Sequence, residues 1–257
     1  MKMCTVISHR NRPDLADALF NRVKELSVTI SNRVLIVDCG GDPYNRTANP
    51  CYWYPDPDFK DGKIRGHIEG VKLLGLDYDY YWLLHPDLTF NDDEALMKLL
   101  KVMCENPEIG LLSPTFNGQY SGNYIGDDDW HPVACVDYLS LLIRGDALRE
   151  VGVLDGDFKY SVGADLDYGY RMWNHDWSVA FCDTVTMHHM GGTTYGAPGT
   201  GTISRREYVV NSGLNAFSVL SRKYGESWGE YMNDAIPEYV TGNQIMFCWD
   251  NRGKRNP

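Results

Sequence analysis

Polar side chains that could do chemistry stand at three places where an apolar, strand-like run of the sequence ends. These groups are Ser8-His9-Arg10, Asp38 and His85-Pro86-Asp87. Ligands of open α/β sheets bind outside the carboxyl ends of the strands, so the three groups are candidates for one shared site. Taken alone, Asp38 and Asp87 also fit turn-forming aspartates. Their place at the ends of successive strands favours the shared site.

A second set of carboxylates and imidazoles lies in the second half of the chain. Asp165 and Asp167 are two residues apart in an expected helix, so they point to different sides and should not share one task. One is expected to face the site and the other to cap or anchor the helix, although both also fit ordinary first-turn positions. His188 and His189 precede two glycines and fit either a plain loop pair or metal ligands. Imidazoles with carboxylates open to solvent suit Mn²⁺ or Mg²⁺ bound largely through a substrate diphosphate, and they suit structural zinc poorly.

Alternating strands and helices must position these residues. Strands are expected at Met3–Ile7, Val34–Asp38, Tyr80–Leu84, Gly110–Leu112, Tyr138–Ile143 and Ser178–Cys182. Helices are expected at Asp14–Leu26, Ile64–Leu74, Asn91–Cys104, Asp146–Val151, Asp165–His175 and Arg205–Tyr224. Asn91 is the expected N-cap of its helix, and the spacing of Gly62, Gly66 and Gly70 predicts close helix packing. This βαβ rhythm predicts an α/β fold with a mostly parallel central sheet flanked by helices.

Two polar segments interrupt the pattern. Residues 114–134 are rich in Gly, Asn and Asp and predict a long surface loop, and residues 183–204 predict a mobile segment that closes over a ligand. We expect a catalytic domain at 1–204, with a nucleotide-sugar half at 1–113 and an acceptor half at 114–204. Residues 205–257 are expected to form a C-terminal helix and tail packed on the same domain.

Composition restricts the class of partner. The 257 residues carry a formal net charge of −11, which disfavours a broad grip on nucleic acid or anionic membrane. Seven cysteines are scattered singly, without a C-x-x-C pair, and predict reduced thiols in the cytoplasm. No apolar run approaches the roughly 18 residues that span a bilayer, and no signal-peptide core follows Met1. Neither a G-x-G-x-x-G fingerprint nor a P-loop occurs, so hydride transfer and P-loop kinase chemistry lose their main support.

From about Thr5 to Tyr224, the order of short motifs resembles the family 2 glycosyltransferases, in particular their rhamnosyltransferase-like subgroup. The matching stretches are Val6-Ile7-Ser8-His9-Arg10, Asp38-Cys39-Gly40-Gly41, Tyr81-Trp82-Leu83-Leu84-His85-Pro86-Asp87, Val136-Asp137-Tyr138-Leu139-Ser140, Val151-Gly152-Val153-Leu154-Asp155, Gly163-Ala164-Asp165-Leu166-Asp167, His189-Met190-Gly191-Gly192-Thr193-Thr194 and Arg205-Arg206-Glu207-Tyr208. The third is similar to the family's Leu-Asn-Pro-Asp variant of the D-x-D motif, with His85 in place of Asn. The sixth is similar to Gly-Glu-Asp-Val-Asp, with Ala164 in place of Glu.

The resemblance implies a GT-A fold, a divalent cation and a nucleotide-diphosphate sugar as donor. It implies that Asp165 is the general base and that Asp87 and His189, with His188 as a substitute, bind the metal. The implied donor contacts are Ser8, Arg10, Asp38, His85 and Arg205, and Arg65 is a further cation that fits the leaving phosphate. On the acceptor side we expect Asp137, Asp167 and the aromatic residues Trp130 and Tyr138, with Tyr120 and Tyr124 also available; the aromatics equally fit loop core.

The predicted function is therefore metal-dependent transfer of a sugar from a nucleotide diphosphate to a hydroxyl, with inversion at the anomeric carbon. Two alternatives remain at this stage. A sugar nucleotidyltransferase handles similar donors, although its Gly-rich, Arg-containing loop is missing here. A catalytically silent sugar-nucleotide or glycan-binding module is consistent with the departures at His85 and Ala164. The acceptor is a glycan, a small molecule or a modified nucleobase in DNA, the last because a local basic patch can be hidden by net charge.

Overall fold

The computed structural model describes residues 1–40, 44, 46–56, 62–116, 129–193, 203–237 and 240. The strands are β1 (Lys2–His9), β2 (Ser31–Asp38), β3 (Cys51–Trp53), β4 (Tyr80–Leu84), β5 (Leu88–Thr89), β6 (Ile109–Phe116), β7 (Trp130–Pro132), β8 (Ser140–Arg144) and β9 (Ser178–His189). The helices are α1 (Pro13–Leu26), α2 (Gly62–Leu74), α3 (Ala95–Glu105), α4 (Gly145–Val151), α5 (Ala164–Trp173), α6 (Arg205–Tyr224) and α7 (Trp228–Asn233).

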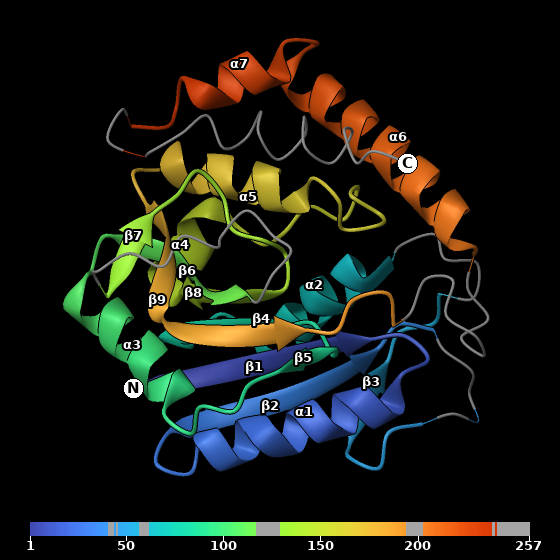
Figure 1. Cartoon of the computed structure of the whole chain (residues 1–257), viewed down its shortest axis with the longest axis vertical. Coiled ribbons are helices and arrows are strands. Elements are labelled where there is room, and N and C mark those ends of the chain that lie inside the picture. Colours follow the sequence, from blue (N-terminus) through green and yellow to red (C-terminus); the bar gives the residue numbers. More distant parts are fainter. Residues whose placement is uncertain are drawn as a thin grey trace.

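One twisted sheet runs through the described residues in the order β3-β2-β1-β4-β8-β6-β9-β5 (Figure 1). The strands β3, β2, β1 and β4 are parallel to one another, and β6 is parallel to β9. Strand β8 lies between β4 and β6 and runs antiparallel to both, while the short β5 and β7 pair antiparallel with β9. The sheet is mixed and mostly parallel, which confirms the predicted α/β class.

Helices cover both faces of this sheet. Helix α1 lies against β1 and β2 on one side and α2 lies on the other (Figure 1). Close approach of α2 depends on its glycines, as predicted: a Cβ added at Gly70 would lie 2.4 Å from Val6 Cγ1, and one added at Gly66 would lie 2.2 Å from Ser8 Oγ. Strand β4 is buried throughout, as expected for a strand covered on both faces. Its burial fixes the turn that follows it, which carries His85 and Asp87.

Two predicted boundaries are wrong near the candidate site. Asn91 does not cap a helix, because the chain first pairs with β9 through Leu88 and Thr89 and α3 begins only at Ala95. The side chain of Asp92 accepts a hydrogen bond from the Glu94 backbone N–H (2.9 Å), which makes a local turn there. Strand β9 does not end at Cys182 but continues to His189. Its Thr184–His188 stretch alternates exposed and buried residues, the period of a half-buried strand.

The expected loop at 114–134 is also shorter than predicted. Strand β6 continues to Phe116 and β7 begins at Trp130, and the residues between them that include Tyr120 and Tyr124 lie outside the described ones. Of the predicted mobile segment, residues 194–202 likewise lie outside the described part of the chain.

Helix α6 has the predicted bounds and lies with α7 at the outer end of the molecule, beyond α5 (Figure 1). It begins with a capping box in which Glu207 N–H donates to Ser204 Oγ (3.2 Å) and the Glu207 carboxylate accepts from Ser204 N–H (2.9 Å). Helix α7 was not predicted, and residues 241–257 of the expected tail lie outside the described ones. No described helix is long and apolar enough to cross a membrane.

Candidate functional site

Three predicted residues meet at the carboxyl end of β4. Asp87 Oδ1 lies 3.2 Å from His85 Nδ1, and Asp87 Oδ2 lies 3.3 Å from His189 Nε2. One ligand atom from each of the three residues lies within 4.8 Å of the others. Asp87 is 3% exposed and His85 is 9% exposed, so the group lies at the edge of the core. We refer to these three residues as the His-Asp-His group.

Two strands hold the His-Asp-His group together. The turn after β4 leads directly into β5, where Leu88 pairs with His189, and Met190 N–H donates to the Asp87 carbonyl oxygen (3.1 Å). Successive side chains of a strand point to opposite faces, so His188 and His189 cannot both face Asp87. The structure brings His189 to Asp87, whereas His188 is exposed and outside the group.

The segment after β9 folds back over Asp87. Gly191 and Gly192 both have positive φ, +62° and +63°, a conformation that glycine adopts without steric cost. This places Thr193 so that its Oγ1 donates to Asp87 Oδ2 (2.7 Å) and its carbonyl accepts from Arg12 Nη1 (3.0 Å). The carboxylate of Asp14 raises the pKa of Arg12 further, and Asp87 acts in the same direction.

Arg205, the first residue of α6, lies beside the same segment. A Cβ added at Gly192 would lie 3.2 Å from Arg205 Nη1. The side of the His-Asp-His group that faces the glycines therefore carries two guanidinium groups, those of Arg12 and Arg205. Cations in this place fit an anionic ligand.

A set of buried rings supports His85 from behind. The ring of Tyr138 stands edge-on to that of His85, with centroids 5.8 Å apart, and its hydroxyl hydrogen-bonds to His67 Nδ1. His67 Nε2 lies 3.1 Å from the Leu84 carbonyl oxygen, and His85 N–H donates to Leu139 (2.8 Å). Tyr138 is thus next to the group, but the structure shows it as a buried support.

The predicted nucleotide residues gather at the carboxyl ends of β1 and β2. Ser8 Oγ lies 3.2 Å from Cys39 Sγ. The buried Arg10 donates through Nη1 to the carbonyls of Cys39 (3.0 Å) and Asp56 (2.7 Å), so it fixes the turn after β2. The Asp56 carboxylate in turn accepts from the N–H of Gly62 at the start of α2 (3.2 Å).

Asp38 is fully buried and lies 3.3 Å from Arg46 Nη1. The Arg46 guanidinium also stands over the ring of Trp53 on β3, 4.4 Å from its centroid. Arg65, on α2, has its guanidinium beside Gly156, where an added Cβ would lie 2.9 Å from Nη2. Its Nε is buried and makes no hydrogen bond within the described residues.

The paired aspartates of α5 have different surroundings. Asp165 is 7% exposed in the first turn, and its Oδ1 accepts from Leu166 N–H (3.1 Å). Asp167 is fully buried and accepts from Arg171 Nε (2.9 Å), Lys223 Nζ (2.5 Å) and Tyr224 OH (2.6 Å). Asp167 therefore ties α5 to α6, which favours the anchor role over the expected acceptor contact.

Of the remaining acceptor candidates, the structure separates Trp130 from the group. Trp130 on β7 pairs with Cys182, which lies seven residues before His189 on β9. Asp137 is buried and adjoins Tyr138, so it lies near the group. Helix α5 packs on the chain segment that leads to Asp137, where Trp173 Nε1 donates a hydrogen bond to the Val133 carbonyl oxygen (3.1 Å).

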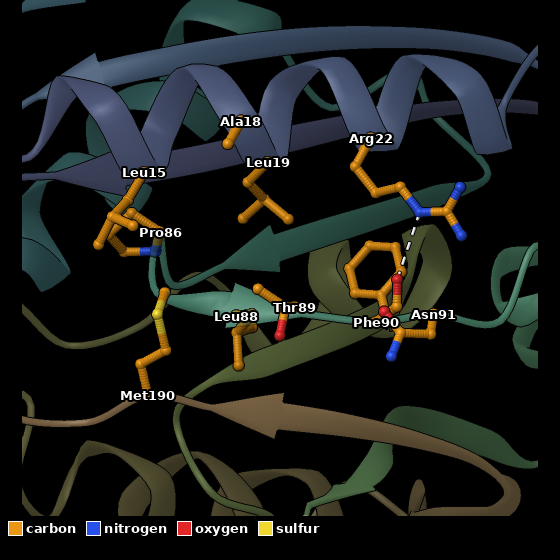
Figure 2. A pocket seen from close by; sticks show the side chains of 10 residues that line it. All are labelled: Leu15, Ala18, Leu19, Arg22, Pro86, Leu88, Thr89, Phe90, Asn91 and Met190. Carbon is orange, nitrogen blue, oxygen red and sulfur yellow. Dashed lines mark hydrogen bonds between the residues drawn. The ribbon is translucent and has the colours of Figure 1, made fainter.

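An apolar cavity of about 380 Å³ lies beside the segment that runs from Pro86 to Asn91. Figure 2 shows Leu15, Ala18, Leu19 and Arg22 of α1 on one side and the 86–91 segment with Met190 on the other. None of the predicted site residues lines it.

Sequence reasoning missed five polar residues around the site, namely Arg12, Arg46, Asp56, His67 and Thr193. Thr193 lies in the His189-Met190-Gly191-Gly192-Thr193-Thr194 motif, so the sequence did carry a signal for it. Arg46 and Asp56 lie on the irregular segment around β3, where no periodicity marks them.

The donor set of the His-Asp-His group fits a divalent cation. Each imidazole nitrogen lies beside a different oxygen of Asp87, at 3.2 and 3.3 Å, and one ligand atom from each residue lies within 4.8 Å of the others. Neighbouring ligand atoms around an ion with bonds of about 2.1 Å are about 3.0–3.4 Å apart, so small side-chain movements would bring the three residues around one ion. Three protein ligands leave further coordination positions for a substrate. With Arg12 and Arg205 alongside, the arrangement can bind a metal ion together with a phosphate group.

No model of a known protein family matches the chain, and no curated protein matches it by sequence. Solved structures do. The mannosyltransferase PcManGT from Pyrobaculum calidifontis, in complex with GDP-Man and Mn²⁺, has a TM-score of 0.59 at 11% identity, over 100% of this chain and 76% of its own. GalNAc-T7 with UDP, GalNAc and Mn²⁺ has a TM-score of 0.58 at 11% identity, over 98% of this chain and 54% of its own. A mycobacterial protein has a TM-score of 0.59 at 12% identity, over 86% and 74%. These likenesses show that the chain has the fold of such glycosyltransferases.

Proposed function

We propose that this protein is a metal-dependent glycosyltransferase that moves a sugar from a nucleotide diphosphate to a hydroxyl group. The observation that carries the proposal is the His-Asp-His group, placed at the carboxyl end of a central strand. Two structures with the same fold contain Mn²⁺ together with GDP-Man or UDP. The fold and the ligand atoms of the His-Asp-His group both support a divalent cation bound together with a nucleotide diphosphate.

Asp87, His85 and His189 would hold Mn²⁺ or Mg²⁺, which when bound neutralises the negative charge that grows on the leaving diphosphate. The chain's own cations add to this effect. Arg205 and Arg12 flank the glycine segment beside Asp87, and their guanidinium groups hydrogen-bond phosphate oxygens well. We propose Arg65 of α2 as a third cation that stabilises the leaving diphosphate.

The nucleotide would lie over the carboxyl ends of β1 and β2. There Arg10 holds the turn after β2 in place through two carbonyl contacts, and Asp38 is oriented by Arg46. Ser8 adjoins both through Cys39. These contacts fix the proposed nucleotide-binding surface before the nucleotide arrives, so that little conformational entropy is lost on binding.

We assign Asp165 as the general base. Its carboxylate would take the proton of the acceptor hydroxyl as that oxygen attacks the anomeric carbon, while the bond to the diphosphate breaks on the other face of the sugar. A single displacement inverts the anomeric configuration. A positioned base contributes about 10²–10⁴-fold to rate. The acceptor is a glycan, a small molecule or a modified nucleobase, with Asp137 on its side of the site.

Ligand binding is tested by thermal denaturation with a panel of nucleotide sugars, with and without Mn²⁺. A donor at a hundred times its Kd stabilises the folded state by about 2.7 kcal/mol, which raises Tm by roughly 5–10 °C for a chain of this size. Asp87→Asn should remove the Mn²⁺-dependent part of that rise. A panel that never shifts Tm would contradict the proposal.

Turnover is tested by hydrolysis of the bound donor and by transfer to acceptors. Asp165→Asn should lower the rate about 10²–10⁴-fold while donor binding is kept. Asp146→Asn, which changes an exposed first-turn aspartate of α4, is the matched control. Product with retained configuration by NMR would refute the single displacement. Wild-type protein that binds a donor but never turns it over would favour the silent binding module instead.

A further inference from the structure

We propose that the apolar cavity between α1 and residues 86–91 is a second binding site, which takes the alkyl chain of a small uncharged molecule. A chain bound there would hold the segment after β9 in its place over Asp87. Figure 2 shows Leu15 and Leu19 of α1 on one wall and Leu88 and Met190 on the other. The lining includes no member of the His-Asp-His group, so this site is separate from the proposed donor site.

The cavity has the size and the lining of a small-molecule site. Its volume of about 380 Å³ falls in the range of about 300–1,000 Å³ that such sites have. Since an apolar cavity of about 150 Å³ holds a benzene ring, this one has room for about fifteen carbon atoms. Leu19, Leu88 and Phe90 are at most 5% exposed and form its floor. Ala18 and Met190 are exposed, so they lie at its mouth.

The charge of the lining favours an uncharged ligand. Arg22 is the only charged side chain among the described residues that line the cavity. Its guanidinium group donates to Asp93 (2.7 Å), to Glu25 (3.4 Å) and, through Nε, to the Phe90 carbonyl oxygen (3.3 Å; Figure 2). The hydrogen bond to Asp93 raises the pKa of Arg22. An anionic ligand would compete with two carboxylates for this cation, whereas an alkyl chain leaves these contacts intact.

The shape of the wall favours an alkyl chain over an aromatic ring. Phe90 is the only ring among the described lining residues, and it already contacts the Arg22 guanidinium (5.7 Å from the ring centroid) and the Trp82 ring (centroids 6.0 Å apart). The rest of the apolar wall consists of Leu, Met, Ala and Pro side chains. Their contacts are non-directional, and the unbranched thioether of Met190 adapts to the shape of a ligand.

Met190 connects the cavity to the segment that covers Asp87. Its side chain lines the cavity, and its N–H donates to the Asp87 carbonyl oxygen (3.1 Å). Gly191 and Gly192 follow and turn the chain, so that Thr193 Oγ1 donates to Asp87 Oδ2 (2.7 Å). A bound chain touches Met190 only while Met190 lies at the mouth, so binding favours this arrangement of the segment over any other.

The test uses the full-length protein with 1-octanol as the probe, without metal ion or nucleotide sugar. In protein labelled with ¹³C-methyl methionine, the Met190 signal, assigned with Met190→Leu, should shift and saturate. Affinity should rise about threefold to fourfold for each methylene from hexanol to decanol. Octanoate should bind no more tightly than octanol, and a tenfold preference for octanoate would overturn the uncharged assignment.

Ala18→Phe places a ring at the mouth and should lower octanol affinity about tenfold or more. Lys24→Phe is the matched control, because Lys24 is an exposed residue of the same helix outside the lining, and it should leave the affinity unchanged. Shifts that never saturate and spread over many methionines in the wild type would overturn the site, as would equal affinity in both variants.

The hold on the segment is measured by amide hydrogen exchange. Octanol should slow exchange of the Met190 N–H about fivefold in the wild type and leave it unchanged in Ala18→Phe. Unchanged exchange in octanol-saturated wild-type protein would overturn the coupling to Asp87. Octanol binding by a protein that never transfers a sugar would leave this site standing and contradict the proposed function, and sugar transfer without octanol binding would do the reverse.

Discussion

At the scale of single residues, Asp165 and Asp167 show how two neighbouring carboxylates acquire different tasks. Three donors from two helices surround Asp167, and none of its surface is exposed. Burial raises the pKa of the Tyr224 hydroxyl, and the adjacent Asp167 raises it further, so that Tyr224 stays a hydrogen-bond donor. Asp167 is thus a structural anchor, whereas Asp165, which is 7% exposed, is the carboxylate that we propose as the general base.

Replacing Asp167 with Asn should lower the free energy of unfolding by about 2–3 kcal/mol, because Lys223 and Arg171 keep their charges but lose their buried partner. Asp157→Asn is the control, since Asp157 and its partner Arg222 are both largely exposed and such pairs contribute about 1 kcal/mol or less. Urea denaturation of the two variants measures both values. Equal losses would show that Asp167 is no anchor.

From the sequence, the types of residue in the site were easier to predict than the residues that they contact. Asp87 was marked by its motif, but the choice between His188 and His189 depends on which imidazole reaches Asp87, and only the fold shows that His189 does. Trp130 was expected to contact the acceptor because it was assigned to a long loop. It lies instead on β7, which pairs with the part of β9 around Cys182, away from His189.

At the scale of elements, the glycines of α2 control how closely this helix approaches the sheet. Gly66 lies where β1 and β2 end, so close that an added Cβ would lie 2.2 Å from Ser8 Oγ and 2.4 Å from Cys39 Sγ. Neither neighbour is the tip of a long side chain. The helix must therefore move away if Gly66 gains a side chain.

Gly66→Ala should destabilise the protein by about 1–3 kcal/mol through overpacking, and it should weaken donor binding because the ends of β1 and β2 shift. Gly213→Ala is the matched control, because Gly213 also lies inside a helix, α6, and an added Cβ there meets nothing within 4 Å. The control should gain about 0.5–1 kcal/mol from helix propensity. Thermal denaturation compares the two, and destabilisation of both would contradict this explanation.

Long elements with a clear period were predictable from the sequence, and short ones were not. Helix α6 was found with its bounds, and β4 was found from its apolar run. Strands β3, β5 and β7 have two or three residues each, too few to show a period, and they exist because a longer strand lies beside them. The extension of β9 did carry an alternation, which the Thr- and His-rich composition of that stretch obscured.

At the scale of the whole molecule, strand β8 joins the parallel strands β3, β2, β1 and β4 to the parallel pair of β6 and β9, and the site takes residues from both sides of this join. Strand β8 inserts between β4 and β6, so residues from the middle of the chain support His85, while His189 arrives from β9. The order of motifs was enough to predict the α/β class. The mixed direction of the strands was not readable, because β8 has the same apolar composition as its parallel neighbours.

The thiol of Cys39 can report whether the end of the sheet formed by β2 and α2 opens. Its thiol has no exposed surface, and burial raises its pKa to about 12, so at neutral pH it is both shielded and unreactive. Alkylation of Cys39 should therefore proceed only when β2 and α2 separate, far more slowly than alkylation of the exposed Cys104. Peptide-resolved mass spectrometry measures both rates, and bound nucleotide sugar should slow the first without changing the second. Equal labelling of the two thiols would mean that this end of the sheet opens freely.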